Sequence, residues 1–232
     1  FWPGWNWRKP VSTFQVPTRA LGQAPDRIDL LANEARDRIR KGDYAWGFRI
    51  LGWTLHYIQD LTQPFHTVQI PSLRMVPWSA ILHWPPTSAF DHLVSEGTRT
   101  ITNYHWAYEG YVRHALVASG PADEDLSPFR ECFEKSGGSI LVATPRELAL
   151  EVVNRSIGRA ARTGDEVMAL VGNGLMDPSV SVPIDPAQVD VENLLKNPAL
   201  AEARGKLNTT TCESLRLATD ASVWIVRWAF AK

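Results

Sequence analysis

The chain has 232 residues, of which 44% are hydrophobic, and 24 lysines and arginines offset 25 aspartates and glutamates to give a net charge of −1. This length can bury a substantial core in one large domain or two small ones. The near-neutral charge supplies no global field for polyanions, so nucleic acid is the less favoured partner. Because no apolar run is long enough and free enough of proline and charge to span a bilayer, we expect no transmembrane segment.

Residues 1–25 hold three tryptophans and four prolines, a composition that predicts an ordered loop covering another part of the chain. Residues 26–41 show the apolar spacing of an amphipathic helix that ends at Gly42, and Asp43 is a plausible N-cap for the next helix. Further helices are expected over 90–100, 103–117, 144 to about 162, from there to 172, and 211–231, with 173–187 as a connection.

No part of the sequence alternates as a strand would, and no internal repeat is present. The sequence therefore predicts an all-α fold, a compact multi-helix single domain over residues 1–232. Cys132 and Cys212 could form one disulfide or remain two buried thiols. No oligomeric state is predicted.

The segment 67–89 combines prolines with many large apolar residues. The prolines preclude a long helix. One interpretation is an irregular loop folded onto the core. The other is an apolar flap at the mouth of a site, which contacts lipid or a partner.

The residues 45–66 contain the strongest chemical signal. His56 and Asp60 are four residues apart, so a helix places them on one face, roughly 5–6 Å apart at Cβ. The surrounding positions are apolar almost all round, which predicts a buried helix whose polar side chains need partners. Pro64 ends this helix and the chain turns to present His66. Two histidines and a carboxylate in this arrangement predict a divalent metal site.

A second helix repeats the spacing with His105 and Glu109. Together with His56, Asp60 and His66 they make five candidate ligands, a set that suits zinc and is too rich in nitrogen for calcium or magnesium. Five ligands exceed the need of one tetrahedral zinc, which indicates more than one ion. Adjacent metal ions favour phosphate ester chemistry, since they polarise phosphoryl oxygens and generate hydroxide near neutral pH.

The remaining histidines lack comparable neighbours. We interpret His83, His92 and His114 as core or surface residues.

These motifs resemble the zinc-dependent bacterial phospholipase C family, which shares a superfamily with single-strand-specific zinc nucleases. The resemblance rests on His56-x-x-x-Asp60-x-x-Gln63-Pro64-x-His66 and His105-x-x-x-Glu109, and is most specific in Leu55-His56-Tyr57, Gln63-Pro64-Phe65-His66 and His105-Trp106-Ala107-Tyr108-Glu109. It extends more loosely from Lys41 to Val112, and the closing helix also fits.

The resemblance implies a compact all-α domain with a trinuclear zinc cluster in the complete protein. His56 and Asp60 would bind the first zinc, with Asp60 bridging to another, while His66, His105 and Glu109 would bind a separate zinc. The family has further ligands and its proposed general base, an aspartate, before this motif. We therefore expect that an N-terminal segment bearing them precedes Phe1, and we assign no catalytic residue within the chain.

Three functions follow as hypotheses. The leading one is a secreted or periplasmic phospholipase C, which hydrolyses glycerophospholipids at a membrane surface to diacylglycerol and a phosphorylated headgroup. Glu109 favours it, since the nuclease branch usually has aspartate there. The alternatives are a single-strand-specific nuclease with tryptophans stacking on bases, and a non-catalytic helical module that binds a partner.

Overall fold

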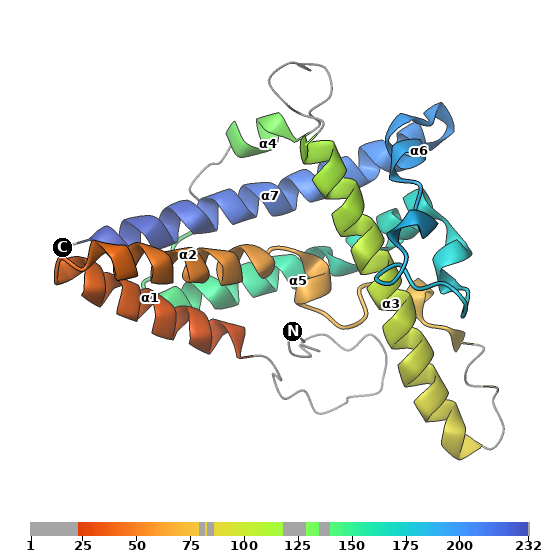
Figure 1. The fold of residues 1–232 in the computed structure, drawn as a ribbon, viewed down its shortest axis with the longest axis horizontal. Coiled ribbons are helices and arrows are strands. Elements are labelled where there is room, and N and C mark those ends of the chain that lie inside the picture. The colour runs from red at the N-terminus through yellow and green to blue at the C-terminus, as the bar shows by residue number, and fades with distance from the viewer. Residues whose placement is uncertain (1–22, 79–81, 83–85, 118–128, 135–139, 232) are drawn as a thin grey trace. The chain divides into compact units, whose positions relative to one another are not determined.

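The computed structural model describes residues 23–78, 82, 86–117, 129–134 and 140–231 (Figure 1). Within these ranges every regular element is a helix, which confirms the predicted all-α fold. The α-helices are α1 (Ala24–Arg40), α2 (Tyr44–Asp60), α3 (Pro86–Val117), α4 (Arg130–Glu134), α5 (Pro145–Val171), α6 (Val191–Lys196) and α7 (Ala201–Phe230). Short 3₁₀ turns include η1 (Pro64–His66), η2 (Leu73–Met75), η4 (Asn173–Met176), η5 (Pro186–Gln188) and η6 (Pro198–Leu200). The loop predicted over 1–25 lies almost wholly outside the described residues.

The chain divides into two compact units. The first holds Phe1–Gln69, Cys132–Arg159 and Glu213–Lys232, and the second holds Ile70–Glu131 and Ala160–Cys212. The single-domain organisation predicted for residues 1–232 stays a prediction.

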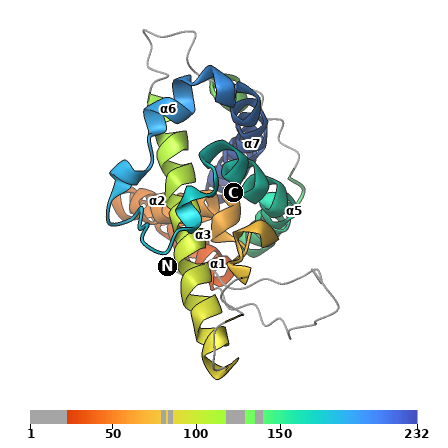
Figure 2. The same ribbon diagram turned by 90° about the vertical axis from the view of Figure 1, so that its right-hand side faces the viewer.

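In the first unit, α1 and α2 form a helical hairpin and lie side by side (Figures 1 and 2). Gly42, at φ +80°, ends α1 in the left-handed region that glycine tolerates best, as predicted. Asp43 caps α2 by accepting a hydrogen bond from the Trp46 backbone N–H at 3.5 Å. The two helices approach closely at Gly47, where a Cβ would lie 2.7 Å from Ile39 Cγ1.

The core of the first unit combines residues from α1, α2, α5 and α7. It includes Ile28, Ala32, Ile58, Leu61, Leu148, Val152, Leu217, Ala221 and Ile225. Two arginines of α1 hold the end of α7, since Arg36 and Arg40 each donate to the Ala231 carbonyl, at 3.1 and 3.0 Å.

In the second unit, α3 organises the segment that follows α5. The fully buried Asn103 side chain donates to the carbonyls of Leu175 and Val180 and accepts from the Val182 N–H. Tyr104 donates to the Gly172 carbonyl at 2.8 Å. The backbone of the predicted connection over 173–187 is therefore held by hydrogen bonds with the Asn103 side chain of α3.

The helix boundaries predicted from the sequence differ from the structure in three places. Residues 90–117 belong to one helix, α3, rather than two. The helix α5 also continues to Val171, because Gly164 does not break it: a Cβ at Gly164 would lie 2.9 Å from Ser72 Cβ, so glycine here permits close packing. The closing helix α7 starts at Ala201, ahead of residue 211, and Thr209 inside it donates its hydroxyl to the Gly205 carbonyl.

The segment 67–89 is described only in part, since 79–81 and 83–85 lie outside the described residues. Met75 and Val76 are buried, while Trp78 and Leu82 are 56% and 85% exposed. Within the second unit, Ser72 of this segment donates to Asp165 Oδ1 on α5. Both interpretations of this segment, an irregular loop folded onto the core and an apolar flap that contacts lipid or a partner, stay predictions.

Candidate metal-binding residues

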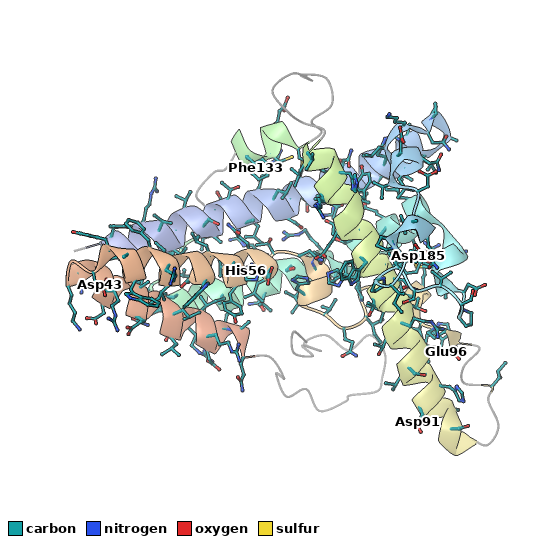
Figure 3. All side chains as sticks on the ribbon, viewed as in Figure 1. Asp43, His56, Asp91, Glu96, Phe133 and Asp185 are labelled. Carbon is teal, nitrogen blue, oxygen red and sulfur yellow. The ribbon has the colours of Figure 1, made fainter. Side chains whose placement is uncertain are left out.

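The helix α2 places His56 and Asp60 one turn apart, as their spacing predicts. His56 Nε2 lies 3.4 Å from Asp60 Oδ2, and the His56 side chain is 70% exposed (Figure 3). The prediction that this helix is buried all round is wrong, because Trp46, Phe48 and Trp53 are each about half exposed. Its buried positions recur every three or four residues, so only one side of α2 packs into the core.

His66 follows α2 on the turn η1, whose conformation is fixed by its neighbours. The Gln63 side chain accepts a hydrogen bond from the Phe65 N–H, and Pro64 supplies the first residue of the turn. Thr67 closes the turn, since its hydroxyl lies 3.0 Å from the Pro64 carbonyl and 3.1 Å from the Ser156 hydroxyl of α5. The turn therefore holds His66 in a defined position beyond the end of α2.

Asp60 is the residue that brings these histidines together. Its Oδ2 faces His56, and its Oδ1 lies 3.7 Å from His66 Nδ1. The Asp60 and His66 side chains are 32% and 24% exposed, so solvent reaches both. A carboxylate with an imidazole nitrogen near each oxygen can bind two cations, one through each oxygen, or bind one cation together with either histidine.

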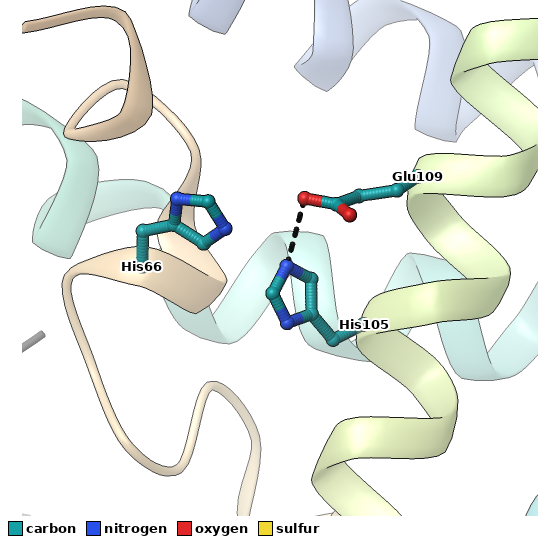
Figure 4. A group of neighbouring side chains, drawn as sticks. All are labelled: His66, His105 and Glu109. Atoms are coloured by element: carbon teal, nitrogen blue, oxygen red, sulfur yellow. Dashed lines mark hydrogen bonds and ion pairs between the residues drawn. The ribbon is translucent and has the colours of Figure 1, made fainter. Parts of the chain in front are cut away.

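The second predicted pair lies on α3. His105 Nε2 and Glu109 Oε1 are 2.9 Å apart, and Figure 4 shows these side chains with their hydrogen bond and also draws His66. Buried tyrosines anchor this part of α3, since Tyr104 bonds the Gly172 carbonyl and the Tyr108 hydroxyl lies 3.1 Å from the Thr211 hydroxyl. The His105 side chain is 24% exposed and the Glu109 side chain is 46% exposed.

Two of the histidines that we interpreted as core or surface residues are described. His114 Nδ1 lies 2.7 Å from the Gly110 carbonyl, a contact within its own helix. His92 Nδ1 lies 3.9 Å from Glu96 Oε1 on the next turn of α3. We did not predict this pair from the sequence, although the spacing of four residues between His92 and Glu96 could have identified it. His83 lies outside the described residues.

Both cysteines are disulfide-bonded, which decides between the alternatives that the sequence left open. Among the described helices, none is long and apolar enough to cross a membrane.

Comparisons with known proteins add no relative. No family model matches the sequence, and neither a curated protein nor a solved structure matches the chain.

Proposed function

We propose that the chain is a zinc-dependent phosphodiesterase, and specifically a phospholipase C. The observation that carries the proposal is the placement of Asp60 between two imidazoles, with one oxygen 3.4 Å from His56 Nε2 and the other 3.7 Å from His66 Nδ1. Imidazole nitrogen and carboxylate oxygen are the ligands that zinc favours when cysteine is absent. In this proposal His56 and Asp60 would hold one zinc, and Asp60 would also serve as a ligand of another.

His66, His105 and Glu109 are the proposed ligands of a separate zinc. In support, each offers one ligand atom, and these three atoms lie within 4.8 Å of one another (Figure 4). Two nitrogens and one carboxylate oxygen make the ligand set of a catalytic zinc that keeps a position open. The His105–Glu109 hydrogen bond of 2.9 Å already aligns the two side chains toward a common point.

The protein's own residues hold and orient the reacting groups in this proposal. Bound zinc supplies positive charge that polarises a phosphoryl oxygen and activates water near neutral pH. Asp60 would offer one carboxylate oxygen on the side of His56 and the other on the side of His66. Gln63 and Thr67, through their hydrogen bonds to the backbone of η1, hold the turn that carries His66.

Phospholipid is the favoured substrate over a nucleic acid. The net charge of −1 gives no attraction for a polyanion. The similarity of the His105 to Glu109 motif to phospholipases C, with glutamate in place of aspartate, supports the same choice. A secreted or periplasmic location agrees with the disulfide-bonded cysteines, since disulfides persist in oxidising compartments.

The test measures metal content and hydrolysis on the purified full-length protein. We expect more than one zinc per chain and hydrolysis of phosphatidylcholine, with little hydrolysis of single-stranded DNA. Zinc-bearing protein that cleaves DNA and leaves phosphatidylcholine intact would make it a nuclease. Zinc-free protein that acts on neither would overturn the enzymatic proposal.

A pair of matched variants on α3 tests the ligand assignment. Glu109→Gln should lower the zinc content and reduce hydrolysis by at least about 100-fold, because the amide is a far weaker zinc ligand than the carboxylate. Glu96→Gln is the control, since Glu96 also follows a histidine by four residues on α3. Equal zinc content in the two variants would show that Glu109 is not a ligand.

A further inference from the structure

An exposed row of residues runs along α2 from its first turn to the proposed zinc ligands. Trp46, Arg49, Trp53, His56 and Asp60 are spaced by three or four residues, so they lie along one face of the helix. Trp46 and Trp53 are 48% and 50% exposed. We call Trp46, Arg49 and Trp53 the tryptophan strip. Figure 3 labels His56, toward which the strip leads.

The strip combines aromatic surface with one positive charge. The Arg49 guanidinium lies 5.1 Å from the centre of the Trp46 ring, a cation–π contact that holds the charge beside the aromatic surface. Residues 44–59 contain no aspartate or glutamate, and the nearest carboxylates in the sequence are Asp43, which caps the helix at Trp46, and Asp60 at the other end of the row. A surface that combines aromatic rings with a positive charge is complementary to a layer that has an apolar interior and anionic phosphates at its surface.

A second exposed aromatic group lies at the same end of α2 but on another side of the helix, because positions 44 and 48 are each two residues from Trp46. Tyr44, Phe48 and Phe230 are 56%, 55% and 46% exposed. Their rings are neighbours, with centroids 6.4 Å apart for Tyr44 and Phe48 and 5.9 Å apart for Phe48 and Phe230. Exposed aromatic side chains grouped in this way mark an interaction surface rather than the scattered apolar residues of an ordinary surface.

We propose that the tryptophan strip docks the protein on a phospholipid bilayer. Tryptophan and tyrosine favour the boundary between headgroups and acyl chains, because their rings are apolar and their N–H and O–H groups remain hydrated. Arg49 would contact lipid phosphates. Docking along the strip brings the His56 and Asp60 end of α2 to the headgroup layer. The choice of phospholipid rests on the proposed function, but docking needs no catalysis and is tested separately from it.

The same features fit single-stranded nucleic acid less well. Such binding needs a track of cations along the backbone in addition to aromatic stacking. The strip has only one cation, Arg49, and the net charge of the chain is −1. Nucleic acid is therefore the outcome that would contradict the proposal.

The test is co-sedimentation of the full chain with vesicles of phosphatidylcholine and phosphatidylglycerol. We expect the Trp46→Ala/Trp53→Ala variant to lower the vesicle partition coefficient by at least about tenfold, because two large aromatic side chains no longer enter the interface. Arg49→Glu should also lower the vesicle partition coefficient, and by a larger factor on vesicles richer in phosphatidylglycerol. Leu30→Ala on α1 should bind as the wild type does, although Leu30 is 68% exposed.

Each outcome decides the proposal. Unchanged binding by a Trp46→Ala/Trp53→Ala variant with a wild-type circular dichroism spectrum would overturn it. Binding of an oligothymidine that exceeds vesicle binding and depends on the strip would also overturn it. If the double variant misfolds, Arg49→Glu alone decides, since Arg49 is exposed and its only described contact is with Trp46.

Glu109→Gln separates docking from catalysis. We expect this variant to bind vesicles as the wild type does while its hydrolysis falls. A different result would refute the docking alone and leave the proposed function intact. In that result the protein has normal zinc content and hydrolyses a soluble phosphodiester normally, but does not bind vesicles.

Discussion

Two glycines of α2 show how single residues set the packing of the first unit. Gly47 faces α1, and a Cβ there would lie 2.7 Å from Ile39 Cγ1 and 3.2 Å from the Ile39 backbone nitrogen. Gly52 is on the exposed side of the same helix, with nothing within 4 Å of an added Cβ. The same substitution should therefore have opposite effects at the two positions.

Gly47→Ala should lower the free energy of unfolding by about 1 kcal/mol or more, because overpacking of 1–3 kcal/mol exceeds the gain in helix propensity. Gly52→Ala should raise it by about 0.5–1 kcal/mol, since only the propensity gain remains. Urea unfolding of both variants measures the difference. Equal effects would show that α1 and α2 do not meet at Gly47 as described.

The candidate ligands could be predicted from the sequence because their chemistry is local. The spacing of His56 and Asp60 fixes a shared helix face, and Pro64 fixes where the helix must stop before His66. Burial could not be predicted in the same way. The apolar residues around His56 suggest a buried helix, yet Trp46 and Trp53 are exposed, because burial depends on which elements pack against α2 and not on its composition.

At the scale of elements, α3 is held in the second unit by two tyrosines whose hydroxyls reach other segments. Tyr104 donates to the Gly172 carbonyl and Tyr111 donates to Asn208 on α7. Burial raises the pKa of both tyrosines to about 12, above the ordinary value of 10.0. Their ionisation is thus disfavoured in the folded chain.

Alkaline pH should destabilise the protein through these tyrosines. Above the unfolded pKa of 10.0 the unfolded chain releases their protons while the folded chain retains them until about pH 12, so stability falls across this window. Tyr104→Phe should make the fall shallower, although it lowers stability at pH 7 by removing a hydrogen bond. Tyr44→Phe is the control, since Tyr44 is 56% exposed. Urea unfolding at several pH values between 8 and 12 gives the slope, and equal slopes for all three proteins would contradict the role of Tyr104.

Helix type was predictable at the scale of elements, but helix ends were not. The apolar periodicity of α1, α2 and α3 is strong enough to identify each as helical. The continuation of α5 to Val171 could not be predicted, because the close packing of Gly164 against Ser72 is a tertiary contact. The start of α7 at Ala201 could not be predicted from propensity either, because threonines have a low intrinsic preference for helix, whereas Thr209 lies inside α7 and donates to the Gly205 carbonyl.

At the scale of the whole molecule, both cysteines are disulfide-bonded. Reduction should lower the free energy of unfolding by about 2–4 kcal/mol, since a disulfide restricts the unfolded chain. The measurement is the melting temperature with and without dithiothreitol. A Cys132→Ala/Cys212→Ala variant should melt at the same temperature in both conditions. A wild-type protein whose melting temperature does not change with dithiothreitol would show that the bond does not stabilise the fold.

The all-α class of the molecule was predictable because no strand pattern competes with the helical periodicity, and the described residues confirm it. The function that we propose was not predictable from composition. The proposal rests on candidate ligands from separate stretches of the chain, His56 to His66 and His105 to Glu109.

Zinc stoichiometry, measured by mass spectrometry on the purified full-length protein and on its Asp60→Asn variant, tests the central claim most directly. Asp60→Asn preserves the shape of the side chain and removes the charge that lies between His56 and His66. We predict more than one zinc per wild-type chain and a loss of at least one in the variant, accompanied by loss of phosphatidylcholine hydrolysis. A wild-type chain without zinc, or a variant with unchanged zinc and activity, would contradict the assignment of Asp60 as the central ligand.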